Sequence, residues 1–274
     1  MMMTGMKRRS LRKMTLTSSN YFSPDANRQF WSVSLFKAFD KCEASGLAQV
    51  KGEYEREEST ALLVGSYVDS YYSNTLDGFI GEHPEIFNSR TGELKADYRR
   101  AEQMIDRIDR DPLMKEFLKG DKQVIRTGSL FDVDWKIKMD VFNGERIVDL
   151  KTVKDFEPMY KEGFGRVSWI EYWGYDIQGA IYQRIEQISS GRDNPLPFYI
   201  AAVTKENVPD IDVIHIPQPV LDTALKVVEA KIDRFDLIKL GEIEPNRCER
   251  CEFCKRTKVL TAPSEYMPQE VADE

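Results

Sequence analysis

The chain has 274 residues, which suits one large domain or one domain with short appendages. Hydrophobic residues make up 41% and charged residues 31%, so the chain can bury a sizeable core and is not globally disordered. The formal net charge of −7 excludes a wholly basic, histone-like nucleic-acid binder, although a local basic groove remains open. Only two histidines occur, which disfavours hydrolase sites that bind zinc through several histidines.

The two ends of the chain differ in composition from its middle. Residues 1–25 are predicted to be a basic flexible tail and residues 261–274 an acidic flexible tail, on either side of one folded domain at 26–260. No run approaches 18 consecutive apolar residues, and no apolar segment follows the basic N-terminus. We therefore expect neither a membrane span nor a signal peptide, and a cytoplasmic, reducing compartment. The N-terminal tail is interpreted as a disordered leader, and the alternative is that its basic residues weakly attract DNA.

Hydrophobic periodicity divides the chain into helices and strands. The apolar residues follow the period of helices in the first part of the chain and the alternation of strands in the middle. Helical and strand patterns then follow one another to the end. In chain order the pattern predicts helices at 30–42, 59–74 and 96–119, strands at 123–131, 133–142 and 145–152, a helix at 168–190, strands at 198–204 and 212–217, and a helix at 220–239. Central strands between helices predict a protein of the α/β (α+β) class, with a central mixed β-sheet flanked by helices.

The segment at 136–151, KIKMDVFNGERIVDLK, predicts a β-hairpin that carries acids. Asn143-Gly144 between two alternating runs is typical of a two-residue type I′ turn. That turn would place Phe142 opposite Glu145, Asp140 opposite Ile147, and Lys138 opposite Asp149.

The alternation then sorts the side chains onto two faces. Asp140, Asp149 and Lys151 are predicted to share the polar face. The opposite, apolar face would carry Ile137, Met139, Val141, Val148 and Leu150. Asp140 and Asp149 would be diagonal neighbours, close enough to converge on one Mg²⁺ or Mn²⁺ ion. The alternative is a solvent-facing strand pair that carries cross-strand ion pairs.

The pattern of Asp140 followed by Asp149-x-Lys151 resembles the PD-(D/E)xK phosphodiesterase signature. The RecB-type branch of that superfamily adds an acid after a glycine on an early helix, which matches Asp69. It also adds Gln-x-x-x-Tyr on a later helix, which matches Gln178 and Tyr182, spaced i to i+4 on one stripe. From about residue 31 to residue 258, the chain is most similar to the phage and prophage exonuclease VIII (RecE)-like group.

The resemblance implies a restriction-endonuclease-like core and a Mg²⁺-dependent DNA exonuclease that degrades linear double-stranded DNA in phage-type recombination or DNA repair. Asp69, Asp140, Asp149 and the carbonyl of Leu150 would hold one or two Mg²⁺ (or Mn²⁺) ions. Lys151 would orient or help deprotonate the attacking water. Gln178 and Tyr182 would position the DNA strand. A single-strand annealing protein as partner and a homo-oligomeric ring are implied by analogy.

The four cysteines are Cys42 and the run Cys248-x-x-Cys251-x-x-Cys254. Disulfides are not expected in a reducing compartment, and four thiolates suit an iron–sulfur cluster or tetrahedral zinc. The placement resembles AddB and the CRISPR-associated iron–sulfur exonucleases, in which a [4Fe–4S] cluster staples the two ends of the nuclease core. The spacing departs from that pattern, which ends with a longer gap before the last cysteine. Structural Zn²⁺ and unligated cysteines are the alternatives.

Five basic residues interleave with these cysteines, and they would either contact DNA phosphates or form a solvated segment. They are Arg247, Arg250, Lys255, Arg256 and Lys258. Two other functions remain open: a CRISPR-adaptation-type iron–sulfur exonuclease, and a nonenzymatic DNA-end binding module. Metal-dependent cleavage separates the enzymes from the module, and gene neighbourhood separates the two enzymes.

Overall fold

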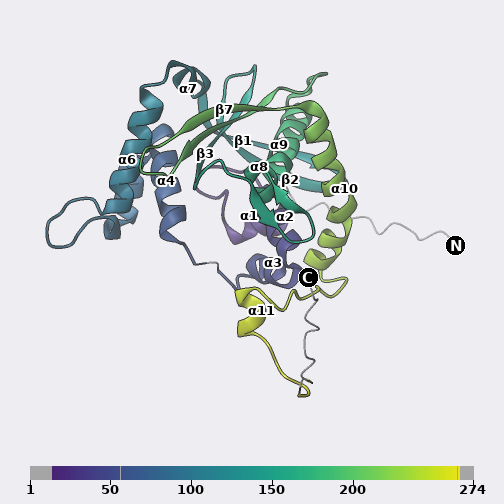
Figure 1. Ribbon diagram of the computed structural model, residues 1–274. Coiled ribbons are helices and arrows are strands. Elements are labelled where there is room, and N and C mark those ends of the chain that lie inside the picture. The colour runs from purple at the N-terminus through teal and green to yellow at the C-terminus, as the bar shows by residue number, and fades with distance from the viewer. Residues whose placement is uncertain (1–13, 56, 264, 266–274) are drawn as a thin grey trace, which may run out of the picture.

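The computed structural model describes residues 14–55, 57–263 and 265. Its centre is a five-stranded sheet in the order β1-β2-β3-β6-β7 (Figure 1). Strands β3 and β6 are parallel and the other neighbouring pairs are antiparallel, so the predicted mixed sheet is confirmed. The strands are β1 (Asp121–Leu130), β2 (Val133–Phe142), β3 (Ile147–Val153), β6 (Phe198–Thr204) and β7 (Ile211–Ile216), and a separate two-stranded hairpin is formed by β4 (Met159–Lys161) and β5 (Gly165–Val167).

Helices cover both faces of the sheet (Figure 1). Side chains of α4 and α6 pack on one face, and side chains of α2, α9 and α10 pack on the other. The helices are α1 (Pro24–Gln29), α2 (Val33–Lys41), α3 (Glu43–Lys51), α4 (Thr60–Tyr72), α5 (Leu76–Glu82), the 3-10 turn η1 (Pro84–Ile86), α6 (Ala96–Asp109), α7 (Pro112–Phe117), α8 (Trp169–Trp173), α9 (Tyr175–Ser190), α10 (Gln218–Leu240) and α11 (Glu252–Arg256).

Two of the predicted helices are interrupted. The helix expected at 96–119 stops before Asp111-Pro112, because Asp111 caps a new helix by accepting from the N–H groups of Leu113 and Met114 at 2.9 Å. The helix expected at 168–190 breaks at Gly174, whose φ of 62° ends α8 and starts α9. After the second break, α9 packs on β1, β2 and β6.

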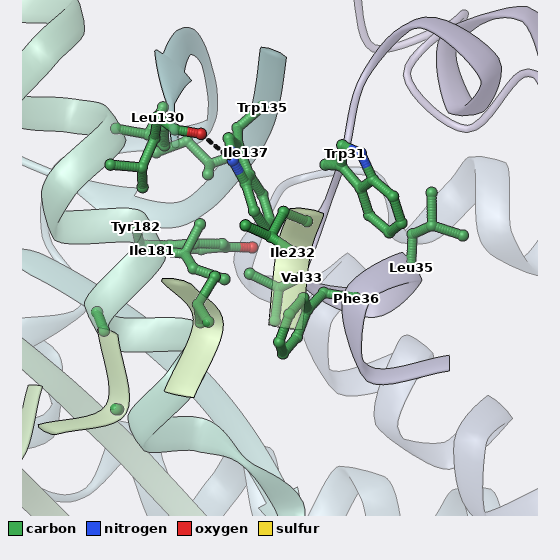
Figure 2. Packing of buried hydrophobic residues seen from close by; sticks show 14 of the residues in the cluster. Trp31, Val33, Leu35, Phe36, Leu130, Trp135, Ile137, Ile181, Tyr182 and Ile232 are labelled. Carbon is green, nitrogen blue, oxygen red and sulfur yellow. Dashed lines mark hydrogen bonds between the residues drawn. The ribbon is translucent and has the colours of Figure 1, made fainter. Parts of the chain in front are cut away.

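The larger apolar cluster lies between the sheet and helices α2, α9 and α10. Figure 2 shows Trp135 of β2 near its centre, with its indole N–H donating to the carbonyl of Leu130 at 3.1 Å. Trp31 and Phe36 approach it from the N-terminal segment, each with its ring centroid 6.2 Å from that of Trp135. This aromatic packing fixes β2, the strand that carries Asp140, against the helices behind it.

The predicted tails fall partly outside the described residues. Residues 1–13, 264 and 266–274 are not described, whereas residues 14–25 are, and Tyr21 is 5% exposed. The packed part of the chain therefore includes Tyr21. In the part of the chain that the structure describes, no helix is both long and apolar enough to cross a membrane.

Candidate functional site

The predicted acids lie where strands β2 and β3 separate. The two strands pair at only two positions, Val141 with Val148 and Phe142 with Ile147, although both strands continue beyond these pairs. Continuing this register would place Asp140 opposite Asp149. The two aspartates are thus the first residues past the pairing, and we call this opening the β2–β3 fork.

The predicted hairpin register is wrong by two residues. Phe142 pairs with Ile147 rather than Glu145, so the connection has four residues instead of two. The side chain of Asn143 stabilises the longer loop by accepting from the N–H groups of Glu145 and Arg146, both at 3.0 Å. Because the shift is an even number, Asp140 and Asp149 remain on one side of the hairpin. Continuing the observed register would make them direct rather than diagonal neighbours.

The single apolar face predicted for the hairpin is also wrong. All five apolar residues are buried, but they belong to two clusters. Ile137 and Met139 pack with α9 and α10, whereas Val141, Val148 and Leu150 pack with α4 and α6. The face changes because β2 turns away from β3 at the fork and continues with β1 alone.

Each carboxylate at the fork has a donor of its own. Gln123 on β1 donates to Asp69 of α4 at 3.2 Å and approaches Asp140 at 3.5 Å. The backbone N–H of Leu150 donates to Asp140 at 3.0 Å. Asp149 is 1% exposed, and its Oδ2 lies 2.5 Å from the ammonium of Lys151. The prediction of a solvent-facing strand pair is therefore excluded for Asp149.

The electrostatics of the fork follow from burial and like charge. Burial raises the pKa of Asp140 well above its usual range, and the charges of Asp149 and Asp69 raise it further. Burial also raises the pKa of Asp69, which Lys138 and Lys151 partly offset. Burial alone would lower the pKa of Lys151, but the attraction of Asp149 and Asp140 outweighs it and leaves the pKa raised. Lys151 is thus held as a cation among three acids.

Helix α9 contributes the two residues predicted from the Gln-x-x-x-Tyr pattern. Gln178 is buried and donates to Asp149 at 2.6 Å, so it directly contacts the acid cluster. Tyr182, one turn further on, is 9% exposed and lies among the apolar side chains drawn in Figure 2. Burial raises the pKa of Tyr182, and Asp149 and Asp140 add to that rise. The structure therefore brings both residues to the fork, with Tyr182 deeper in the core.

Three residues at this site have no counterpart in the predicted set. Gln123 has a φ of 53°, unusual for a strand residue that is not glycine, and its amide lies between two acids. Tyr175 and Lys37 lie on the α9 side, where the ammonium groups of Lys37 and Lys151 are 5.2 and 5.1 Å from the Tyr175 ring centroid. Burial and the charge of Lys151 lower the pKa of Lys37 to about 8. Gln123 and Lys37 were not predicted because neither residue belongs to a motif that can be recognised in a single sequence.

The oxygen donors at the fork fit a hard divalent cation in chemistry, since like-charged buried carboxylates are the groups that such an ion stabilises. In the described residues, however, the four cysteines are the only set of three or more Cys, His, Asp or Glu residues whose ligand atoms lie close enough to share one ion. The carboxylates are instead turned toward Gln123, Gln178 and Lys151. Ion binding at the fork would replace some of these donors.

The four cysteines converge from opposite ends of the chain. Their sulfur atoms all lie within 4.8 Å of one another, with Cys254 3.6 Å from Cys42 and 3.9 Å from Cys248. Four thiolates at about 2.3 Å from one zinc ion in a tetrahedron would be roughly 3.8 Å apart. The donor set and its spacing are therefore compatible with a metal site.

The cysteine environment also shows polarised thiols. Backbone N–H groups of Cys251 and Cys254 point at the sulfurs of Cys248 and Cys251, at 3.3 and 3.4 Å. Burial opposes ionisation of Cys248, but hydrogen bonds from the backbone N–H groups of Arg250 and Cys251 and from its thiol neighbours lower its pKa to about 6, whereas burial and the neighbouring thiols raise the pKa of Cys251 to about 12. A thiol with the pKa of Cys248 is largely the thiolate that metals bind.

Contacts around the cysteines join the two ends of the domain. Glu43 at the start of α3 accepts from the backbone N–H of Asn246 at 2.6 Å and pairs with Arg234 of α10 at 2.8 Å. Figure 1 shows α11 beside α3. Three of the five interleaved basic residues have acidic partners within the protein, as Arg247 pairs with Glu249, Arg250 with Glu162, and Arg256 with Glu252. These pairs favour the solvated-segment interpretation for those three.

Comparisons with known proteins agree with this architecture. A family model described as "PDDEXK-like domain of unknown function (DUF3799)" matches residues 32–257. A crystal structure from Eubacterium rectale, described as a "Putative exonuclease", shares 44% sequence identity and a TM-score of 0.88, over 92% of this chain and 97% of that chain. A second structure, SSO0001, matches at 13% identity over 81% of this chain and 91% of its own, and its TM-score of 0.29 supports no argument. A search of curated proteins gave no match.

Proposed function

Because the chain belongs to the DUF3799 family of PDDEXK-like domains, we propose that it is a metal-dependent DNA exonuclease that hydrolyses phosphodiester bonds of linear double-stranded DNA. The observation that carries the proposal is the β2–β3 fork, where Asp140, Asp149 and Lys151 meet Asp69 and Gln178. The E. rectale relative, described as a "Putative exonuclease", supports the exonuclease class. The wider setting of phage-type recombination or repair, with a single-strand annealing partner, rests on the RecE-like sequence resemblance.

The proposed roles follow from the position of each side chain. Asp69, Asp140, Asp149 and the carbonyl of Leu150 would hold Mg²⁺ or Mn²⁺. The ion would polarise the scissile phosphate and lower the pKa of a bound water. Lys151, kept positively charged by its acidic neighbours, would orient that water and offset charge on the phosphate. Gln178 would hold Asp149 in place through the 2.6 Å hydrogen bond.

We also propose that the four cysteines bind a metal centre that is structural. Support comes from the meeting of Cys42 with Cys254, 212 residues apart in sequence, and from the acidic thiol of Cys248. The short sulfur separations favour one tetrahedral ion such as zinc. The Cys-x-x-Cys-x-x-Cys spacing is also found in iron–sulfur proteins. Iron, zinc and acid-labile sulfide analysis of protein purified without air distinguishes the two.

The function is tested on linear duplex DNA labelled at either the 5′ or the 3′ end. Purified protein is incubated with Mg²⁺ or with EDTA, beside the Lys151→Ala variant and a circular DNA of the same sequence. We expect Mg²⁺-dependent loss of the linear DNA alone, abolished in the variant, and the label released first gives the polarity. Cleavage of the circle would indicate an endonuclease. Binding of DNA ends without cleavage, by protein with full metal content, would indicate a nonenzymatic module.

A further inference from the structure

A buried lysine attaches the N-terminal segment to the catalytic strand. Lys136 of β2 is 1% exposed, and its ammonium donates to the carbonyl of Tyr21 and, at 2.7 Å, to the side chain of Asn27. In return, the hydroxyl of Tyr21 donates to the carbonyl of Lys136 at 3.4 Å. Burial lowers the pKa of Lys136 to about 8. A buried charge is costly unless it is hydrogen-bonded, so these bonds hold Tyr21 firmly against β2.

The residue after Tyr21 is an exposed phenylalanine in a fixed position. Phe22 is 68% exposed, and its ring lies edge-on to the ring of Tyr21 with centroids 5.0 Å apart. The ammonium of Lys138, on β2, lies 4.6 Å from the centroid of the Phe22 ring. The chain therefore presents an exposed aromatic ring with a positive charge over it, on a backbone that Lys136 has anchored.

This pair lies next to the acids of the fork. Lys138 precedes Asp140 by two residues on β2, the strand that leads to the fork. The charge of Lys138 acts on Asp69, where it opposes the effect of burial on the pKa. The Lys138 ammonium also lies 5.6 Å from the centroid of the Tyr21 ring, so Tyr21 and Phe22 both contact the part of β2 that leads to Asp140.

We propose that Phe22 and Lys138 form a nucleotide-binding subsite beside the fork. The Phe22 ring stacks on an unpaired base, and the Lys138 ammonium contacts a phosphate of the same strand. This inference rests on the proposed nuclease function and adds the form of DNA that the site takes: a strand end or single-stranded segment whose base is free to stack.

The ligand class follows from the chemistry of the pair. Exposed aromatic rings beside cations are the surfaces on which single-stranded nucleic acid is held, because every base has a π-face. Inside a duplex, base faces are already stacked on one another, so the ring can stack only at a strand end or on an unpaired base. Lys138 supplies positive charge next to three carboxylates, where an anionic strand is otherwise repelled. The subsite therefore selects strands that have been opened.

The experiment measures DNA binding by the full chain, with Ca²⁺ replacing Mg²⁺ and intact DNA verified afterwards. Short single-stranded oligonucleotides carry one abasic position, moved stepwise from the end. For normal DNA we expect Phe22→Ala to weaken binding roughly 5- to 100-fold, the range of one base–aromatic stack. At one abasic position the wild type should lose the same amount, and Phe22→Ala should cause no further loss. Phe22→Trp should retain tight binding.

Two further variants separate the subsite from general surface effects. Phe164 is 73% exposed and also has a lysine near its ring, with Lys161 5.1 Å from the centroid, so Phe164→Ala is the matched control. It should leave binding and the abasic response unchanged. Lys138→Gln should reduce the slope of log affinity against log salt concentration by about one, as expected for one lost phosphate contact.

Equal binding of normal and abasic DNA by wild type and Phe22→Ala would overturn the subsite. If the wild type in that case still cleaved linear DNA with Mg²⁺, the proposed nuclease function would stand without the subsite. A wild-type protein that neither bound nor cleaved DNA would overturn both. Thermal unfolding confirms that the exposed substitutions leave the fold intact.

Discussion

The acid fork and the cysteine centre are built on different supports. The acids project from two strands and one helix, each set in an apolar cluster of the core. The cysteines come from the junction between α2 and α3 and from a segment whose one helix, α11, has five residues. The apolar cluster around them contains few residues beyond the cysteines themselves: Ala44 and Phe253. The packing of the core therefore positions the acids of the fork. The segment around the cysteines has little packing of its own, so a metal bound there would have to stabilise it.

Because of this difference, a bound metal would have a different effect at each site. At the fork, a metal ion would supply chemistry and relieve repulsion among carboxylates that the scaffold already positions. At the cysteines, the polypeptide has little packing of its own, so a bound metal would contribute folding free energy directly. Removing a ligand should therefore cost activity at the fork and stability at the cysteine centre.

The largest effect is expected for Asp149→Asn. The substitution keeps the shape and the acceptor for Gln178 but removes the charge that faces Lys151. Cleavage of linear DNA with Mg²⁺ should fall by about 1000-fold or more, equivalent to about 4 kcal/mol. The melting temperature should change by only a few degrees. Gel assays and thermal unfolding check both, and a folded variant with near-normal activity would remove Asp149 from the catalytic set.

Cys254→Ser is expected to show the opposite balance. Cys254 is fully buried and 3.6 Å from Cys42, so its loss should reduce metal content and lower the melting temperature by several degrees. A loss of 1 kcal/mol corresponds to roughly 2–4 °C for a domain of this size. Limited proteolysis should cut first between α10 and the C-terminus. Tyr54→Phe, which removes a contact to Glu252 from the same region, is the control and should keep its metal.

Two buried glutamines of α9 allow effects on activity and on stability to be compared within one helix. Gln178 donates to Asp149, whereas Gln183 donates to the carbonyl of Leu196 at 2.7 Å, away from the acids. Gln178→Ala should lower activity about 10- to 100-fold by leaving Asp149 less well positioned. Gln183→Ala should cost about 1–3 kcal/mol of stability, because it leaves a buried carbonyl unpaired. Equal losses of activity in both variants would mean that α9 acts only through its packing.

The sequence predicted the sheet, its flanking helices and the elements that carry the acids, because alternation and helical periodicity report burial directly. It placed Asp140 and Asp149 on one side of the hairpin correctly, since a two-residue error in register preserves the face. It missed the fork, because separation of strands past Val141 depends on tertiary packing. Gln123 was missed for a related reason: its left-handed backbone and its contact with Asp69 arise only in the folded sheet.

The cysteine centre shows the same limit in another form. The spacing of Cys248, Cys251 and Cys254 indicated a metal site, and the remote Cys42 was included because it was the only cysteine left. The meeting of these sulfurs is a property of the fold. The choice between one ion and a cluster depends on sulfur separations, which the sequence pattern does not contain.

The smallest expected effect comes from Asp140→Asn in the metal-free protein. Burial and the charges of Asp149 and Asp69 raise the pKa of Asp140, so the folded state holds this proton more tightly than the unfolded chain does. The ionised carboxylate therefore destabilises the fold as pH rises through the raised pKa.

In EDTA at pH 8, Asp140→Asn should be more stable than the wild type by on the order of 1 kcal/mol, or a few degrees. The difference should shrink as pH falls toward about 4, where the unfolded carboxyl also takes up its proton. Added Mg²⁺ should stabilise the wild type and not the variant. Thermal unfolding at each pH checks this, and equal stability in EDTA at pH 8 would mean that the carboxylates at the fork do not repel one another enough to affect the fold.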